Sequence, residues 1–258
     1  MRFQDIVMTA ATQGGGAAAN PDALGTALAA LEAAGKLVSA WYLPDPNPAQ
    51  YLTITPATND VALWTAAYGT QKVDLAVEVA APQWDATLFS NKGGVTFNGT
   101  TQRLLGTGNV VNWPDASTDL YMGAAISVAA PTGVRRALSY GSTASSTRAL
   151  GNTSGPVMTA TVGTTALTGA STISGGSTLG LVCDIGGTSA VYLNGVSDGT
   201  ASTASGALTI SRVRMGASVV STASQFFQGT LAGGFILGPT ATLTDFTTLL
   251  ALYQARVT

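Results

Sequence analysis

VTFNGTTQRL (residues 95–104) and VYLNGVSDG (residues 191–199) share one design. Each stretch alternates apolar and polar residues and then reaches an Asn-Gly pair. Asn and Gly adopt the positive φ angles of a type I′ turn at low energetic cost, so an Asn-Gly pair between alternating runs predicts a tight β-hairpin. Two such hairpins, in a chain rich in Gly, Ser and Thr, predict a domain built from antiparallel strands.

Short runs with a period of two residues recur from Leu37 to near the C-terminus, separated by clusters of Gly, Pro, Asn, Ser and Thr. We expect strands at 37–42, 60–65, 73–79, 94–98, 102–105, 119–128, 134–140, 157–162, 179–185, 189–193, 207–216 and 226–237. Twelve short strands with little helix predict a mainly β fold, a two-sheet antiparallel jelly-roll sandwich. Its core should contain Trp41, Trp64 and Trp84, which lie in or beside apolar runs.

The segment 142–178 consists mostly of Gly, Ser, Thr and Ala. It is open to two interpretations, a disordered linker or short polar strands joined by loops. Apolar residues recur within it, among them Val157, Val162 and Leu167, and they favour the strands.

Residues 21–35 predict a helix near the N-terminus. Asn20 is a suitable N-cap, and Gly35 is placed to end the helix. The helix carries one narrow stripe of leucines: Leu24, Leu28 and Leu31. This stripe packs either against its own domain or against copies of itself in a small helix bundle, and the sequence leaves both alternatives open.

The last residues, TLTDFTTLLALYQARVT, predict a second helix. Thr244 is the expected N-cap, Asp245 lies near the positive end of the helix dipole, and Arg256 lies near its negative end. The large apolar residues share one face: Phe246, Leu249, Leu250, Tyr253 and Val257. We expect this face to pack on the sandwich.

Composition limits the functions open to the chain. Charged residues make up 9% of its 258 residues, against about 25% in typical soluble domains, and the net charge is −2. Without a basic run, nucleic-acid binding is not expected, and no stretch is long and apolar enough for membrane insertion. The single cysteine, Cys183, excludes an internal disulfide and is expected to be a small buried apolar residue.

Catalytic groups are scarce, and we expect no enzymatic activity. The chain has no histidine, which removes Ser-His-Asp, Cys-His and His-metal chemistry. A glycosidase needs two positioned carboxylates, but the only glutamates are Glu32 and Glu78. Asp74 and Glu78 would lie roughly 13 Å apart on a strand, at about 3.3 Å per residue, whereas a retaining pair needs about 5 Å.

The order of three motifs carries a resemblance. The motifs are GGVTFNGTTQRLL (93–105), LGLVCDIGGTSAVYLNGV (179–196) and FFQGTLAGGFILGPTATLTDFTTLLALY (226–253). In this order they resemble the laminin G-like jelly rolls of the concanavalin A-like lectin and glucanase superfold, in the form carried by virion proteins of phages and gene transfer agents. The superfold includes lectins, glycosidases and inert spacers, so the resemblance indicates a fold more strongly than a function.

The resemblance implies a head spike or fibre protein on the virion surface, extracellular after particle release. Residues 1–36 would form an arm and helix for anchoring to other virion or capsid proteins or for homo-oligomerisation. Residues 37–258 would form a lectin-like domain that binds the capsular polysaccharide of the host without cleaving it. A purely structural capsid decoration or spacer is the alternative, and a glycoside hydrolase is the less favoured one.

Sugar recognition requires an aromatic face and planar polar groups. Trp113 precedes Pro114, which favours an extended or turn conformation, and it lies among Asn112 and Asp115. Tyr140 and Arg148 flank the next polar loop. We expect carbohydrate binding at these five residues: Trp113, Asn112, Asp115, Tyr140 and Arg148. The alternative for Trp113 is a loop tryptophan that covers the edge of the core.

Calcium is the other chemistry that the superfold implies, with loop Asp and Asn oxygens as ligands. WPDASTD (113–119) and DIGGTS (184–189) offer such oxygens. Neither stretch has the density of carboxylates of a dedicated site. We therefore expect solvated turns and no cofactor, and calcium stays an alternative.

Overall fold

The computed structural model describes residues 22–106, 119–128, 133–141, 147–184, 187–203, 212–218 and 225–258. The helical segments are α1 (Ala23–Ala33), α2 (Leu88–Asn91) and α3 (Leu243–Val257). The strands are β1 (Leu37–Tyr42), β2 (Leu52–Thr55), β3 (Asp60–Trp64), β4 (Leu75–Val77), β5 (Gln83–Asp85), β6 (Gly94–Asn98), β7 (Leu104–Gly106), β8 (Leu120–Val128), β9 (Arg135–Gly141), β10 (Arg148–Asn152), β11 (Val157–Val162), β12 (Thr165–Thr172), β13 (Gly176–Cys183), β14 (Thr188–Leu193), β15 (Val196–Ser202), β16 (Arg212–Met215) and β17 (Gln228–Leu237). The predicted mainly β, antiparallel fold with a helix near each end is confirmed.

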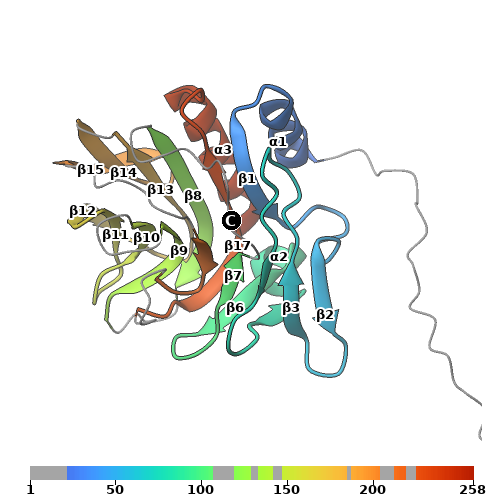
Figure 1. Ribbon diagram of the computed structural model, residues 1–258. Coiled ribbons are helices and arrows are strands. Elements are labelled where there is room, and N and C mark those ends of the chain that lie inside the picture. Colours follow the sequence, from blue (N-terminus) through green and yellow to red (C-terminus); the bar gives the residue numbers. More distant parts are fainter. Residues whose placement is uncertain are drawn as a thin grey trace, which may run out of the picture.

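The strands form two sheets that pack face to face. Sheet A has the order β15-β14-β13-β8-β17-β6-β5, with β1 beside the second half of β17. Sheet B has the order β12-β11-β10-β9-β16-β7-β4-β3-β2. A single pair, Asp60 with Gln83, joins β3 to β5 and so connects the sheets along one edge, which we call the seam. Figure 1 shows β8 and β13–β15 lying over β9–β12.

The main core lies between the two sheets. Alternate residues of facing strands fill it, including Met122 of β8, Leu138 of β9 and Leu181 of β13. Trp41 and Trp64 are fully buried and Trp84 is 9% exposed, which confirms the prediction for the three tryptophans. Cys183 is a buried free thiol in the same core, also as predicted.

Helix α3 covers the outer face of sheet A, across β8, β13 and β17. The predicted apolar face is buried there, with Phe246, Leu249, Leu250 and Tyr253 fully buried. Gly180 of β13 makes the close approach possible, since a Cβ atom at this position would lie 2.5 Å from Phe246 Cζ. The N-cap prediction was wrong by two residues. Thr242, not Thr244, caps the helix and forms a capping box with Asp245.

Helix α1 packs beside α3 and β1 on its own chain (Figure 1). Its leucine stripe is buried against these elements, which supports packing within the domain over the helix bundle of copies. Asp22 is the observed N-cap, because its Oδ1 accepts from the Gly25 amide at 2.7 Å. Gly35 ends the helix with a φ of 68°, as expected. No helix among the described residues is long and apolar enough to cross a bilayer.

The two Asn-Gly pairs have different roles. Asn194 and Gly195, with φ of 52° and 79°, form the predicted hairpin turn between β14 and β15. The predicted hairpin at Asn98 was wrong, because β6 pairs with β5 and β17 whereas β7 pairs with β4 and β16. Here the Asn98 Oδ1 accepts from the amides of residues 100, 101 and 102, and the chain passes from sheet A to sheet B.

Candidate functional site

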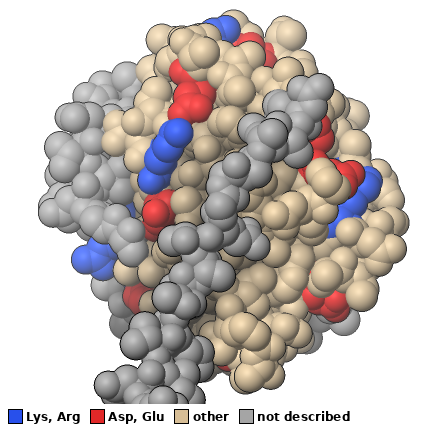
Figure 2. Space-filling view, turned by 90° about the vertical axis from the view of Figure 1, so that its right-hand side faces the viewer, with Lys and Arg blue, Asp and Glu red and all other residues tan. Residues whose placement is uncertain are grey.

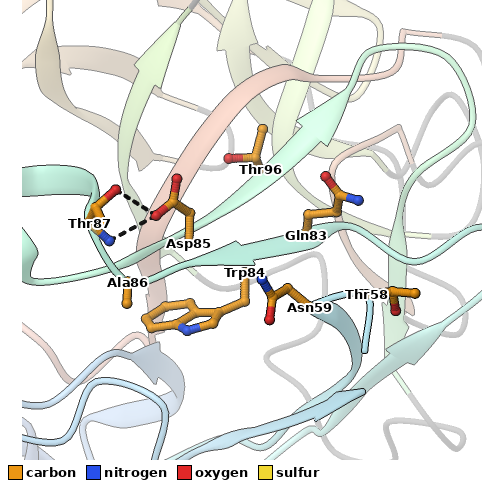
Figure 3. Close-up of a pocket in the computed structure, with 8 residues that line it drawn as sticks. All are labelled: Thr58, Asn59, Gln83, Trp84, Asp85, Ala86, Thr87 and Thr96. Atoms are coloured by element: carbon orange, nitrogen blue, oxygen red, sulfur yellow. Dashed lines mark hydrogen bonds between the residues drawn. The ribbon is translucent and has the colours of Figure 1, made fainter. Parts of the chain in front are cut away.

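A surface hollow of about 730 Å³ lies at the seam between the two sheets. Its lining residues are Thr58, Asn59, Gln83, Trp84, Asp85, Ala86, Thr87 and Thr96. They come from the turn between β2 and β3, from β5 and the residues after it, and from β6 (Figure 3). We call this cavity the seam hollow.

Backbone pairing holds the two walls of the seam hollow together. The Val61 amide donates to the Pro82 carbonyl and the Trp84 amide donates to the Asn59 carbonyl, both at 2.8 Å. Asn59 has a φ of 58°, a conformation that asparagine tolerates better than most residues, and it ends the turn before β3. The lining side chains are therefore carried by a fixed backbone.

The Trp84 side chain holds β5 in place because it packs into the main core. Its neighbours Gln83 and Asp85 point to the opposite side of the strand, as Figure 3 shows and as the two-residue period of a strand requires. The ring packs in the main core and against Gly93, where a Cβ atom would lie 2.0 Å from Trp84 Cη2. The buried indole fixes the exposed polar residues on either side of it.

Asp85 has one engaged and one free carboxylate oxygen. The Thr87 hydroxyl and the Thr87 amide both donate to Oδ1, at 2.7 and 2.8 Å (Figure 3). These hydrogen bonds lower the pKa of Asp85 below its ordinary value of 3.8, so the carboxylate is ionised at neutral pH. The other oxygen, Oδ2, has no partner among the described residues and is exposed with the rest of the side chain.

The side-chain amides of Asn59 and Gln83 are also exposed, and neither has a partner within the described chain. Each amide presents two donors and an acceptor. The third strand of the site contributes Thr96, whose hydroxyl lies 3.1 Å from that of Thr230 on β17. Free amides, a carboxylate oxygen and hydroxyls on adjacent strands are groups that match the donors and acceptors of a polyhydroxylated ligand.

Two carboxylates lie at the seam hollow, those of Asp85 and Asp60. Asp60 neighbours it, opposite Gln83, and its Oδ2 accepts from the Thr58 hydroxyl at 2.7 Å. A general acid requires a carboxyl group with a raised pKa, whereas the pKa of Asp85 is lowered. The ionised Asp85 carboxylate is therefore suited to accept hydrogen bonds from a ligand.

Elsewhere, Glu78 is paired with two arginines. Arg214 binds both of its carboxylate oxygens, at 2.6 and 2.7 Å, and Arg103 binds one of them at 2.8 Å. Asp74 accepts from the Ala66 amide instead. Each of these two carboxylates is thus occupied by a partner of its own.

Of the five predicted sugar-binding residues, the structure describes only Tyr140 and Arg148, and neither lines the seam hollow. Trp113, Asn112 and Asp115 lie outside the described residues. Tyr140 and Arg148 are paired on β9 and β10, and both are fully buried. Both side chains are closed to solvent in this conformation.

The two stretches considered for the calcium alternative fall partly outside the described residues as well. Residues 113–118 and 185–186 are not described. Within the described ranges, no group of three His, Cys, Asp or Glu residues is placed to hold a metal ion.

The seam hollow was not predicted, although one of its segments, APQWDAT (81–87), contains a usable signal. A polar residue on each side of a tryptophan fits a strand with one core-facing and two exposed positions. The strand has only three residues, and its role depends on its pairing with β3, which local sequence does not show.

Comparisons with known proteins show the fold. No family model matches the sequence, and no curated protein is significantly similar to it. The binding domain of botulinum neurotoxin serotype D/C superposes with a TM-score of 0.58 at 10% identity, over 86% of this chain and 53% of that one. A botulinum neurotoxin type C structure that concerns interaction with two ganglioside molecules gives 0.58 at 9% identity, over 87% and 52%.

A third similar structure is the Trypanosoma rangeli sialidase in complex with 2,3-difluorosialic acid, with a TM-score of 0.54 at 15% identity, over 85% of this chain and 33% of that one. The chain thus spans about half the length of the toxin chains and a third of the sialidase chain. At such identities the likeness concerns the β-sandwich fold alone.

Proposed function

We propose that this protein is a non-catalytic carbohydrate-binding module and that the seam hollow holds the sugar. The observation that carries this proposal is a set of polar groups without partners among the described residues that meet at the seam. They are the Gln83 amide and Asp85 Oδ2 on β5, which Trp84 anchors in the core, and the Asn59 amide in the turn opposite. The structures that share the fold include proteins described with gangliosides and with sialic acid derivatives, which supports a glycan as the ligand.

Binding to a printed array of neutral and acidic oligosaccharides, followed by calorimetry on the strongest ligand, tests the proposal. We expect Gln83→Ala to weaken binding about tenfold, the loss of one or two hydrogen bonds. Gln50→Ala is the matched control, because Gln50 is an exposed glutamine outside the hollow. Equal affinity of the two variants, or no binding of the unmodified protein to any oligosaccharide, would overturn the proposal.

The absence of catalysis has its own test. The protein is incubated with the bound oligosaccharide, and reducing ends are measured over time. We expect no release above the rate without protein. Release that disappears in Asp85→Asn would identify a hydrolase instead.

We further propose the biological setting implied by the family resemblance, a spike or fibre on a virion surface that binds host capsular polysaccharide. The low charge of the surface, on which Figure 2 shows scattered charges of both signs on one face, suits a particle protein that contacts uncharged polymers. Residues 1–36 would supply the anchor or the contacts of a homo-oligomer. Several copies would raise a weak single-site affinity by avidity, by roughly 10²–10⁴-fold.

Adsorption to cells tests this setting. The purified protein should bind capsulated cells and should not bind capsule-deficient ones. The alternative, a structural decoration or spacer, predicts equal binding to both kinds of cell and altered particle assembly when the gene product is lost.

A further inference from the structure

A row of polar side chains continues from the seam hollow across sheet A. The register pairs Asp60 with Gln83, Gln83 with Thr96, Thr96 with Thr230 and Thr230 with Ser127. Directly opposed residues of an antiparallel ladder share a face, so all five lie on one side of the sheet. We call them the polar row.

Four residues of the polar row lie on the outer face of sheet A, where the cover of helices ends, and Asp60 continues the row onto β3 of sheet B. The residues next to it on β6, Val95 and Phe97, face the main core, so Thr96 faces outward. On the helix side, α3 and its neighbours cover the sheet, and Ala232 and Ala125 are buried in that second core. The row therefore forms the first polar line beyond the helical layer.

The segment α2 borders the polar row with an aromatic ring. A Cβ atom on Gly94 would lie 2.5 Å from Thr230 Cγ2, 2.9 Å from Phe89 Cε2 and 3.3 Å from Leu88 Cδ1. The side chains of Phe89 and Thr230 thus lie close together over Gly94, which has no side chain of its own. The Phe89 side chain is only partly buried, which leaves part of its surface open to solvent.

The backbone that carries Phe89 is strained. Phe89, Ser90 and Asn91 have φ values of 51°, 57° and 67°, so α2 is a left-handed turn of three residues with side chains. This conformation is unfavourable for residues other than Gly, Asn and Asp, and strain of this kind is concentrated at functional sites. The Lys92 backbone amide caps the turn by donating to the Leu88 and Phe89 carbonyls, and the Lys92 ammonium donates to the Ala255 carbonyl of α3.

We infer that Phe89 is the apolar platform of the carbohydrate site and that a bound oligosaccharide extends from the seam hollow along the polar row to Thr230. This inference rests on the proposed function and adds the ligand class, a linear chain of pyranoses longer than one unit. From Gln83 to Thr230 the polar row spans about 10 Å, at about 4.8 Å per strand, and Thr230, which is 9% exposed, closes its far end. Phe89 supplies the apolar surface that the seam hollow lacks, because the Trp84 ring is buried.

Two phenylalanine variants test the inference on the printed oligosaccharides of one to six units. Phe89→Leu keeps an apolar side chain on Gly94 and removes the aromatic face, and we expect it to weaken binding of the longer oligosaccharides at least fivefold. Phe89→Trp keeps an aromatic face and should bind within twofold of the unmodified protein. Affinity of the unmodified protein should rise from one unit to three.

A control variant distinguishes a loss of sugar recognition from a change in the structure of the turn. Leu88→Ala alters the same turn and the same contact with Gly94 without touching an aromatic ring. It should bind within twofold of the unmodified protein, and melting temperatures should be compared for all variants. Fivefold weakening by Leu88→Ala would show that Phe89 acts only through the fold of the turn.

The outcomes distinguish this inference from the proposed function. If Gln83→Ala weakens binding but Phe89→Leu does not, or if affinity is independent of chain length, the extended site is wrong and the seam hollow stands. If no oligosaccharide binds to the unmodified protein, both proposals are wrong.

Discussion

The Tyr253 hydroxyl lies 3.0 Å from the backbone carbonyl oxygen of Trp41 and donates to it, and the Gly234 carbonyl oxygen is a second acceptor at 3.2 Å. These contacts join α3 to β1 and β17, across 212 residues of sequence in the first case. Tyr253 is fully buried, and burial raises the pKa of its hydroxyl well above the ordinary value of 10.0. The hydroxyl is therefore a permanent donor at physiological pH.

Tyr253→Phe should lower the free energy of unfolding by about 1–3 kcal/mol, because it removes the buried donor and leaves the ring packing intact. Urea denaturation of the variant measures this. Tyr192→Phe is the control, since Tyr192 is only partly buried. An equal loss in both variants would contradict a specific role for the hydroxyl of Tyr253.

Glu78→Gln should destabilise the protein by about 3 kcal/mol, since it leaves the guanidinium of Arg214, 3% exposed, without its counter-charge. Burial alone would raise the pKa of Glu78, but hydrogen bonds from Arg214 and Arg103 outweigh it and lower the pKa below 4.5. A lowered folded pKa means that the pair stabilises the fold above about pH 4.5 and that this contribution is lost as the pH falls through the folded pKa.

Urea denaturation between pH 7 and pH 3 tests both statements. The difference in unfolding free energy between the unmodified protein and Glu78→Gln should shrink as the solution becomes acidic. Glu32→Gln is the control, because the partner of Glu32, Lys72, is 53% exposed, and such pairs contribute about 1 kcal/mol or less. A difference that stays constant down to pH 3 would contradict the assignment.

Arg148→Met should leave the free energy of unfolding unchanged or raise it. The Arg148 side chain is fully buried, and its Nε and Nη2 atoms have no hydrogen-bond partner within the described chain. Its Nη1 atom donates to the Thr147 carbonyl at 3.2 Å. Burying a charged group that is only partly satisfied is costly, and a well-packed apolar side chain of similar length avoids that cost. A loss of more than about 1 kcal/mol in urea denaturation would show that the guanidinium has a stabilising partner.

The same variant tests the role that the sequence suggested for Arg148 in carbohydrate binding. With the side chain buried beside Tyr140, we expect the affinity for array oligosaccharides to be unchanged. A weakened affinity at unchanged stability would return Arg148 to the binding site.

Patterns within a few residues of sequence were sufficient to predict the helix faces and turns that local backbone preferences determine. The apolar face of α3 and the turn at Asn194 follow from side-chain spacing and from backbone preferences within a few residues. The passage from sheet A to sheet B at Asn98 could not be predicted in this way. Whether an Asn-Gly pair closes a hairpin depends on which distant strands pair with the two strands that flank it. The short strands β2 and β5 were missed for the same reason. The strands β10 and β12 lie within 142–178, where the apolar residues favoured strands over a linker, and β15 is the second strand of the hairpin predicted at Asn194.

The candidate site was harder to predict than the fold. Trp84 was correctly assigned to the core, and alternation alone then places Gln83 and Asp85 outside. Gln83 and Asp85 lie beside Asn59 only because Asp60 pairs with Gln83 and so joins the two sheets. The periodicity of the sequence does not show this pairing. The left-handed turn at Phe89 contradicts local preference, since no glycine occupies its three positive-φ positions.

The seam hollow should discriminate by ligand charge. Its lining contains the ionised Asp85 and no basic side chain, and Asp60 lies beside it without an ion pair among the described residues. A second unit charge about 6 Å from a carboxylate in water changes affinity about threefold. Neutral and amino sugars should therefore bind more tightly than uronic or sialic acids of the same length, and the difference should fall with added salt.

Asp85→Asn should raise the affinity for acidic oligosaccharides relative to neutral ones by about that factor, whereas Asp45→Asn, at an exposed aspartate outside the hollow, should not. Because the pKa of Asp85 is lowered by its bonds with Thr87, the unmodified protein should keep its preference down to about pH 4 and lose it only in more acidic solution. Calorimetry with a neutral and an acidic trisaccharide at several pH values measures both effects. Tighter binding of the acidic sugar by the unmodified protein would place its recognition at another surface of the molecule.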